Sequence, residues 1–549
     1  MKKKILSFTF VICICLNLLA VSPLSVFAEE SGTCGDNLTW TLSGNTLTIS
    51  STGDMYDYNS DTDVPWYQIK DDIYYLVIDN GVTSIGNYAF YRVTHITDVT
   101  IPTGVKSIGA WSFYSCFRIE TIAIPGSVQS IKENAFCWCD GLKEVTLTEG
   151  IKSIKDYAFI YCKNLSKINI PSSVECIGAD VFGDTHNLII TVDENNEVYS
   201  SLDGVLFNKD KTEIITYAKD NIQDEYIIPD GVIFIRSNSF CACKNLKSVQ
   251  LPNSIEYIED GAFSQCDTLS NINIPNSVTT IGGSAFYSCY TLTDITIPFG
   301  VTYIGGEAFN GCKSLNIYVD EKNEYFSSLD GVLFNKDKTE IITYAKDKID
   351  SEYVIPYGVT SIEQYAFHYC TDLTNVKIPN TVKSIKRGAF NICRSLTSIT
   401  IPDSINIIED SAFYNCQSLT DVYYTGTQEQ WEQITIGKNN TYLQNATIHY
   451  NCSPEQSRPV CQINGAVASA DKMTVYVSSS LGAVNNTMLI AKYKSGILIG
   501  LNEKQIDLSA DSNEVVFENF TKGNADTIKI MLWSRAEPFK PLCDEYTIL

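Results

Sequence analysis

Histidine is scarce in this chain of 549 residues, which has only four, and basic residues are outnumbered, 40 lysines and arginines against 64 acidic residues. The scattered histidines have no spacing suited to a catalytic triad or a metal site, and His368 is expected to be a surface or turn residue. The formal net charge of −24 makes nucleic acid a poor partner, because phosphate binding needs clustered positive charge. No phosphate loop, dinucleotide fingerprint or nucleophile elbow occurs. We therefore expect a non-enzymatic protein without cofactor or metal.

Long apolar runs are absent after the first 28 residues. Residues 1–28 join three lysines to an apolar stretch and end in the small residues Val26 and Ala28, which is typical of a secretory signal peptide. An uncleaved anchor is the alternative, because the stretch is long enough to span a bilayer. We expect a secreted, extracellular monomer with no membrane span after cleavage, either released or associated with the cell surface.

A phenylalanine recurs at a fixed interval, which is 23 residues within each of three groups (Phe90 to Phe113) and 58 between groups (Phe182 to Phe240). A fixed period in this range indicates a solenoid, whose coils bury their apolar faces only by stacking. Within each coil Ile272 and Ile274, or their equivalents, alternate with polar residues as in a short strand. We expect parallel pairing of these strands and a buried phenylalanine spine. The twelve positions are Phe90, Phe113, Phe136, Phe159, Phe182, Phe240, Phe263, Phe286, Phe309, Phe367, Phe390 and Phe413.

One complete coil, Leu269 to Cys289, reads L-x-x-I-x-I-P-x-S-V-x-x-I-G-x-x-A-F-x-x-C. This pattern resembles the BspA-like leucine-rich repeats of bacterial surface proteins, and the match covers about residues 81–424. The resemblance implies a leucine-rich-repeat solenoid with a parallel β-sheet, short turns and 3-10 segments. Departures such as Val93 and Thr185 at the cysteine position put single coils in doubt, not the architecture.

Ten cysteines follow the phenylalanines by three residues, as Cys139 follows Phe136. Free cysteine packs as a small hydrophobic residue, so we interpret them as a ladder of buried thiols. Neighbouring coils would place them within disulfide range, so sporadic cross-links stay open. Cys137 and Cys241 add C-x-C spacings that are too short and isolated for a zinc site.

The flanks of the repeats change in composition and suggest caps and a further domain. A hairpin is expected around Ser43 to Asn45, and Thr427 with Gln430 forms a capping box for a short helix. Short strands after the repeats indicate a small C-terminal β-sandwich. The expected divisions are a signal peptide (1–28), an N-terminal cap (29–80), repeats (81–424) with two long coils (183–239 and 310–366), a C-terminal cap (425–452), a linker (453–460) and a β-sandwich (461–549).

The long coils contain the same 21 residues twice, SSLDGVLFNKDKTEIITYAKD, from Ser200 to Asp220 and from Ser327 to Asp347. Two strand-like runs around NKDKT predict a β-hairpin that projects from the array. Either recent copying or a shared function would explain the identity. The proposed binding tips are Lys209, Asp210, Lys211, Lys336, Asp337 and Lys338.

The best metal-like stretch has Asp57, Asn59 and Asp61 at alternate positions, as in a calcium loop. Thr62 stands where the loop needs glycine and Gln68 where it needs glutamate, so a solvated acidic turn is favoured.

Three classes of function remain. The family resemblance implies an adhesin that presents a rigid array to host matrix proteins, glycans or other microbes. The alternatives are an enzyme or accessory module acting on carbohydrate or protein, and a structural spacer. Outward strand positions are short and polar, whereas protein hot spots favour Trp, Tyr and Arg, so we expect the sheet to be poorly suited to a tight protein ligand.

Overall fold

The computed structural model describes residues 30–548, apart from 186, 219–223, 346–351, 453–460, 469–471, 480–482, 496, 509–510, 519, 524 and 535–545. The expected signal peptide and linker lie outside the described residues. The chain divides into two compact units, residues 1–181 and 182–549, which are described separately. None of the helices in the described ranges is long and apolar enough to cross a membrane.

The first unit begins with three antiparallel strands that lead into the coils, and the expected hairpin forms between β2 and β3, where Ser43 pairs with Thr46. Two short 3-10 helices follow, and β3 then pairs in parallel with the first long strand, Leu47 opposite Leu76. Trp66 packs face to face with Phe90 at 5.7 Å and donates its indole N–H to the Ala89 carbonyl oxygen. The elements are β1 (Glu30–Thr33), β2 (Leu38–Ser43), β3 (Thr46–Ser51), η1 (Asp61–Asp63) and η2 (Tyr67–Asp72).

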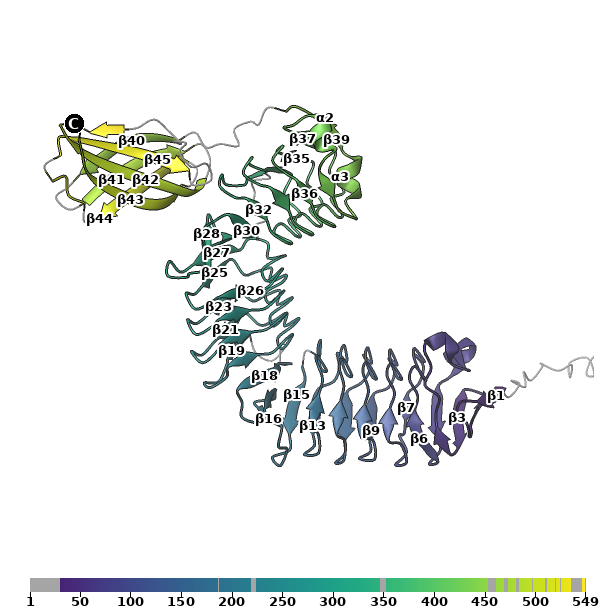
Figure 1. Ribbon diagram of the computed structural model, residues 1–549. Helices are drawn as coiled ribbons and strands as arrows, with labels where there is room; N and C mark the ends of the chain where they lie inside the picture. Colours follow the sequence, from purple (N-terminus) through teal and green to yellow (C-terminus); the bar gives the residue numbers. More distant parts are fainter. Residues whose placement is uncertain are drawn as a thin grey trace, which may run out of the picture. The chain divides into compact units, whose positions relative to one another are not determined.

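Each coil of the first unit contributes one strand to each of two parallel stacks (Figure 1), called here the long strands and the short strands, although β7 of the first stack has two residues and β6 of the second has four. Burial alternates along the long strands, so isoleucines face the core and polar residues face solvent. The long strands are β5 (Tyr75–Ile78), β7 (Asp98–Val99), β9 (Thr121–Ile124), β11 (Glu144–Leu147) and β13 (Lys167–Ile170). The short ones are β4 (Gly53–Asp54), β6 (Val82–Ile85), β8 (Ser107–Ile108), β10 (Ser130–Ile131), β12 (Ser153–Ile154) and β14 (Cys176–Ile177).

The phenylalanine spine forms as predicted, with successive rings stacked face to face at 5.2 Å from Phe90 to Phe159. All of these rings are fully buried. The turn that carries each ring is held by backbone bonds to the next coil, as Phe113 N–H donates to the Ala135 carbonyl oxygen at 2.8 Å.

The cysteine ladder has a defined bonding role. Each ladder thiol donates to the carbonyl oxygen of the spine residue one coil earlier, as Cys139 Sγ does to Phe113 at 3.1 Å. All ten cysteines make this contact, and the other distances run from 3.0 to 3.9 Å. Each sulfur is present as a thiol and satisfies a carbonyl at the turn. The ten are Cys116, Cys139, Cys162, Cys243, Cys266, Cys289, Cys312, Cys370, Cys393 and Cys416.

The second unit repeats the arrangement of long and short parallel strands in two blocks of coils. Its long strands are β15 (Ile189–Val192), β19 (Glu225–Ile227), β21 (Ser248–Gln250), β23 (Asn271–Asn273), β25 (Asp294–Ile297), β27 (Asn316–Val319), β31 (Glu352–Val354), β33 (Asn375–Lys377), β35 (Ser398–Ile401), β37 (Asp421–Tyr424) and β39 (Thr447–His449). Its short strands are β20 (Phe234–Ile235), β22 (Tyr257–Ile258), β24 (Thr280–Ile281), β26 (Tyr303–Ile304), β32 (Ser361–Ile362), β34 (Ser384–Ile385), β36 (Ile407–Ile408) and β38 (Thr435–Ile436).

The duplicated stretches each form three strands that belong to the short-strand sheet. They pair antiparallel with one another, and the third then pairs in parallel with the short strand of the next coil, Ile214 opposite Ile235 and Ile341 opposite Ile362. The strands are β16 (Tyr199–Leu202), β17 (Val205–Asn208) and β18 (Glu213–Thr216), then β28 (Phe326–Leu329), β29 (Val332–Asn335) and β30 (Glu340–Thr343). The predicted hairpin therefore forms, from β17 and β18 and again from β29 and β30, but the expectation that it projects is wrong, because β18 and β30 pair with the next coil in the solenoid wall.

The long coils also contain a hidden spine position. Tyr217 stacks on Phe240 at 4.8 Å and donates its backbone N–H to the Ser239 carbonyl oxygen, as a spine phenylalanine does. Since 240 − 217 = 23 and 217 − 182 = 35, the 58-residue step is one 35-residue coil followed by one ordinary coil. Tyr344 repeats this arrangement beside Phe367 at 5.1 Å. The two tyrosines bring the spine positions to fourteen, against the twelve phenylalanines predicted, and the solenoid as a whole has about 16 turns.

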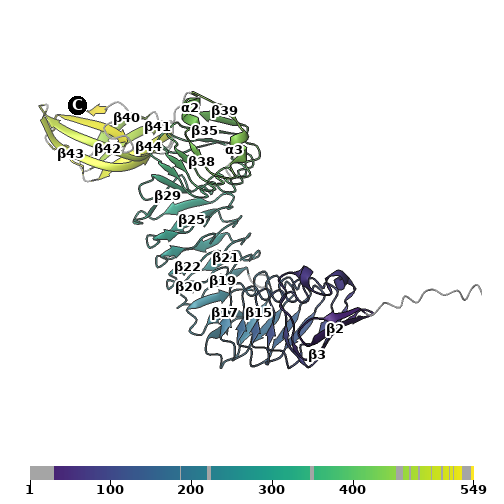
Figure 2. The same ribbon diagram turned by 45° about the vertical axis from the view of Figure 1, so that its right-hand side comes forward.

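The end of the solenoid and the last domain follow the predicted pattern. Thr427 and Gln430 form the capping box of α2 (Gln428–Trp431), and α3 (Thr441–Asn445) precedes β39. The small C-terminal sandwich consists of two antiparallel sheets, in which β42 and β43 are the longest strands (Figure 2). The sheets are β40 (Cys461–Ala468), β41 (Lys472–Ser479) and β44 (Asp511–Glu518), and β43 (Ile497–Leu508), β42 (Ala483–Lys494), β45 (Thr527–Ser534) and β46 (Tyr546–Ile548).

Candidate functional site

The long strands of each unit present a regular outward surface. Because each coil supplies the same strand positions, outward side chains form columns along the stack. Most of the short polar positions named by the sequence are exposed, as Asn271 and Asn273 are on β23. The pattern changes in the last block, where bulkier side chains border a recess.

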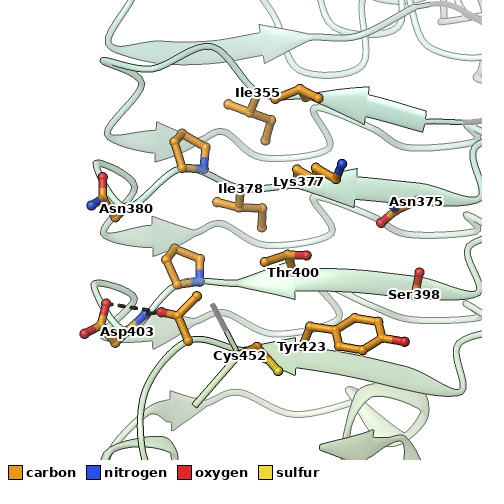
Figure 3. A pocket seen from close by; sticks show the side chains of 14 residues that line it. Ile355, Asn375, Lys377, Ile378, Asn380, Ser398, Thr400, Asp403, Tyr423 and Cys452 are labelled. Carbon is orange, nitrogen blue, oxygen red and sulfur yellow. Dashed lines mark hydrogen bonds between the residues drawn. The ribbon is translucent and has the colours of Figure 1, made fainter. Parts of the chain in front are cut away.

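This recess, called here the Thr400 recess, has a volume of about 500 Å³ and lies over β33, β35 and β37 (Figure 3). Thr400 is opposite Lys377 on one neighbouring strand and opposite Tyr423 on the other. The short threonine therefore forms a floor between a long side chain and an aromatic ring. The lining residues are Val354, Ile355, Asn375, Lys377, Ile378, Pro379, Asn380, Ser398, Thr400, Pro402, Asp403, Tyr423, Thr425 and Cys452.

The two side chains that form the walls of the recess, Tyr423 and Lys377, each contact a residue on the side away from Thr400. His449 stacks on Tyr423 at 4.9 Å, and its strand is paired with β37 on the side away from Thr400. On the other wall, Lys377 Nζ lies 2.7 Å from the Glu352 carboxylate. The recess is thus preformed, because each wall residue already has a partner behind it.

The charges around the recess are largely paired within the protein. The His449 ring N–H donates to Asp421 at 2.8 Å, and this bond is the main reason that the pKa of Asp421 is lowered. Thr420 adds a second hydrogen bond to the same carboxylate. At the rim, the Thr425 hydroxyl accepts from the backbone N–H of Asp403 at 2.8 Å. Sequence spacing did not predict this group, because Asp421 and His449 belong to different elements.

A second recess, of about 720 Å³, lies where the second long coil joins the array. Tyr318 on β27 and Glu352 on β31 border it, and Ser328 and Asp330 of the duplicated stretch line its floor. Tyr318 is 50% exposed. In the first copy, Thr191 occupies the position of Tyr318, since 318 − 127 = 191. The two copies therefore present different outward surfaces although 21 of their residues are identical.

The proposed tip residues lie at the turns between the hairpin strands. Lys209 and Asp210 are exposed, and the Lys209 amine donates to the backbone oxygens of Glu194 at 3.2 Å and of Asn196. Lys336 makes the same two contacts in its own copy. These lysines thus fasten the preceding turn, and a direct role in binding stays a prediction. The six positions are Lys209, Asp210, Lys211, Lys336, Asp337 and Lys338.

The histidines are dispersed, as the sequence indicated, and His368 lies in a turn, which was one of the two positions expected for it, but it is not at the surface. His368 is only 8% exposed, and its Nδ1 lies 3.1 Å from the Glu307 carboxylate. His95 stacks on Tyr74 at 4.8 Å. His186 lies outside the described residues.

The acidic stretch at residues 54–63 does not gather its carboxylates around one point. Asp57 accepts from the Asn87 backbone N–H at 2.9 Å and lies 3.7 Å from Lys132, whereas Asp61 lies 4.0 Å from Lys70. Within the described part of the chain, no group of three or more His, Cys, Asp or Glu residues is arranged to hold a metal.

Comparison with known proteins identifies the repeat. The family model described as the BspA type leucine rich repeat region matches in six copies, at residues 66–189, 213–335 and 343–455. No curated protein matches the chain. Similar solved structures include a leucine-rich repeat protein from Eubacterium ventriosum (23% identity, 78% of this chain, 97% of that chain, TM-score 0.43). A second is a leucine rich cell surface protein from Faecalibacterium prausnitzii (23% identity, 74% of this chain, 97% of that chain, TM-score 0.40). A third is the pneumococcal vaccine antigen PcpA (20% identity, 77% of this chain, 98% of that chain, TM-score 0.41).

Proposed function

Since the chain belongs to the BspA-type leucine-rich repeat family, we propose that it is a non-enzymatic adhesin, secreted or held at the bacterial cell surface. In this function the long-strand sheet presents binding sites to host matrix proteins, glycans or other microbes. The family membership supports a surface binding role, and the signal-like residues 1–28 support export.

One observation carries the proposal: the outward sheet holds a preformed recess with side chains of both signs and one aromatic wall. Ligand sites are typically concave, of 300–1,000 Å³, with a few polar groups that fix orientation, and the Thr400 recess has this size. The nearby carboxylate Asp421 is engaged by His449 and has a lowered pKa, whereas a general acid at neutral pH needs a raised one. The recess is accordingly better suited to binding than to proton transfer.

The test is a binding screen of purified residues 29–549 against arrayed glycans, matrix proteins and intact bacterial cells. Saturable binding to at least one surface, with no turnover of bound polysaccharide or protein, is the expected result. Turnover without surface binding would favour an enzyme, and complete absence of binding would favour a structural spacer. Fractionation of producing cells would test attachment, with the protein expected in the wall fraction or the medium.

A further inference from the structure

We propose that the Thr400 recess binds a single hexopyranose unit of an uncharged glycan. This inference rests on the adhesin function proposed above and specifies the ligand class of one site. It is argued from the shape of the recess, the polar groups that line it and the charge of the chain.

The shape comes from an unusual sequence of side chains in one outward column. The column reads Lys377, Thr400, Tyr423 and His449 on consecutive paired strands. Because neighbouring strands are about 4.8 Å apart, the Lys377 and Tyr423 backbones are separated by roughly 10 Å, which leaves room for one ring over Thr400. Since His449 covers the outer face of Tyr423, the face toward Thr400 is available for stacking.

The polar lining matches a ligand rich in hydroxyl groups. Ser398 and Thr400 place hydroxyls on the floor, and Asn375 and Asn380 place amides at two sides. Hydroxyl and amide groups both donate and accept, as sugar hydroxyls do. A pyranose also has an apolar C–H face, which complements the exposed face of Tyr423. The combination of one aromatic wall with hydroxyls and amides therefore fits a sugar ring.

Charge selects an uncharged sugar over an acidic one. Lys377 is the cation of the lining, and Glu352 already neutralises it at 2.7 Å. Asp403 adds a carboxylate at the rim, and the whole chain carries a formal charge of −24. Like-charge repulsion would therefore weaken the binding of sialylated or sulfated glycans.

A peptide ligand fits this face less well. The long strands on either side of the recess are paired in a continuous parallel ladder from β31 to β39, so their backbone groups are not available to an added strand. Of the Trp, Tyr and Arg residues that are enriched where proteins bind tightly, the recess contains a single one, Tyr423.

The experiment measures binding of residues 29–549 to polyvalent neutral oligosaccharides of glucose, galactose and mannose, beside sialylated and sulfated glycans and deglycosylated matrix proteins. Thr400→Trp fills the recess and should abolish neutral-glycan binding. Thr146→Trp is the matched control, because Thr146 is an exposed threonine of a long strand whose neighbour is Ala123. Tyr423→Ala should weaken binding about tenfold, which corresponds to ~1.4 kcal/mol.

A footprint within the same chain gives a second readout that does not depend on the variants. Cys452 lines the recess, whereas Cys176 is exposed on β14 of the other unit. Bound oligosaccharide should slow the alkylation of Cys452 by iodoacetamide at least threefold and leave that of Cys176 unchanged. Peptide mass spectrometry reports both sites in one sample, and circular dichroism confirms that each variant is folded.

The outcomes separate the two proposals. Neutral-glycan binding that Thr400→Trp removes and Thr146→Trp keeps supports the inference. Binding only to acidic glycans or to proteins, or neutral-glycan binding that survives Thr400→Trp, overturns the inference and leaves the adhesin function standing. Absence of binding to every probe overturns both.

Discussion

The cysteine ladder should make the first unit sensitive to mild alkali. Burial raises the pKa of the Cys116, Cys139 and Cys162 thiols far above the ordinary value of about 8.5. A group with a raised folded-state pKa stabilises the fold fully below its unfolded pKa and loses this contribution as the pH rises toward the folded value. The relevant window therefore opens near pH 8.5.

The expected magnitude follows from the linkage relation. Each thiol that ionises only in the unfolded chain lowers the free energy of unfolding by ~1.4 kcal/mol per pH unit. Between pH 8.5 and 10 this is about 2 kcal/mol per thiol and about 6 kcal/mol for the three. A loss of this size is comparable to the whole stability of many domains, about 5–15 kcal/mol. Staying at or below pH 10 limits the contribution of tyrosines, which ionise near that value.

The assay is pulse proteolysis of residues 29–549 in urea at pH 8.5 and pH 10, read by mass spectrometry of peptides from residues 105–181. A local readout is needed because solenoid coils can unfold segment by segment. The control replaces Cys116, Cys139 and Cys162 by valine, which already occupies the equivalent position at Val93. The wild-type unfolding free energy should fall by about 6 kcal/mol more than that of the triple variant. Equal falls in both proteins would refute the assigned role of the thiols.

Three further predictions follow from burial. Phe286→Ala should cost about 3–5 kcal/mol in urea unfolding, because its ring is fully buried in the spine; a cost under ~1 kcal/mol would contradict the register. Phe207→Ala in the first duplicated stretch should cost a similar amount, whereas Leu202→Ala, at a 37% exposed site of the same stretch, should cost under ~1 kcal/mol; equal costs would mean that the hairpin is not part of the wall. In native protein Cys176 should react with iodoacetamide at least tenfold faster than Cys139, since only Cys176 is exposed; similar rates would indicate an open ladder.

The regular coils could be predicted from the sequence because three independent sequence signals indicate the same local structure. The 23-residue period, the alternation around Ile272 and Ile274 and the proline that ends the strand all indicate the same local structure. The capping box at Thr427 was predictable for the same reason, since its partners are three residues apart. The family model and the structure confirm this architecture.

The long coils and the recess could not be predicted in the same way. Tyr217 lies in phase with Phe240, but a repeat defined by its phenylalanines does not include a tyrosine at the same position. The hairpin residues carried a strong turn signal, but whether such a hairpin projects or joins a sheet depends on a neighbouring strand that local patterns do not identify. The recess arises from Lys377, Thr400 and Tyr423, which are adjacent only after three coils have stacked.

The position of Tyr217 in the spine also bears on how the repeat array can gain or lose turns by duplication. The interval from Phe182 to Phe309 is 127 residues, which is one 35-residue coil and four ordinary coils, so it contains only whole turns. Unequal crossing-over between the two identical stretches would add or remove this interval without shifting the spine. Gain or loss of this block would therefore change the number of turns in a step that keeps the remaining spine positions in phase.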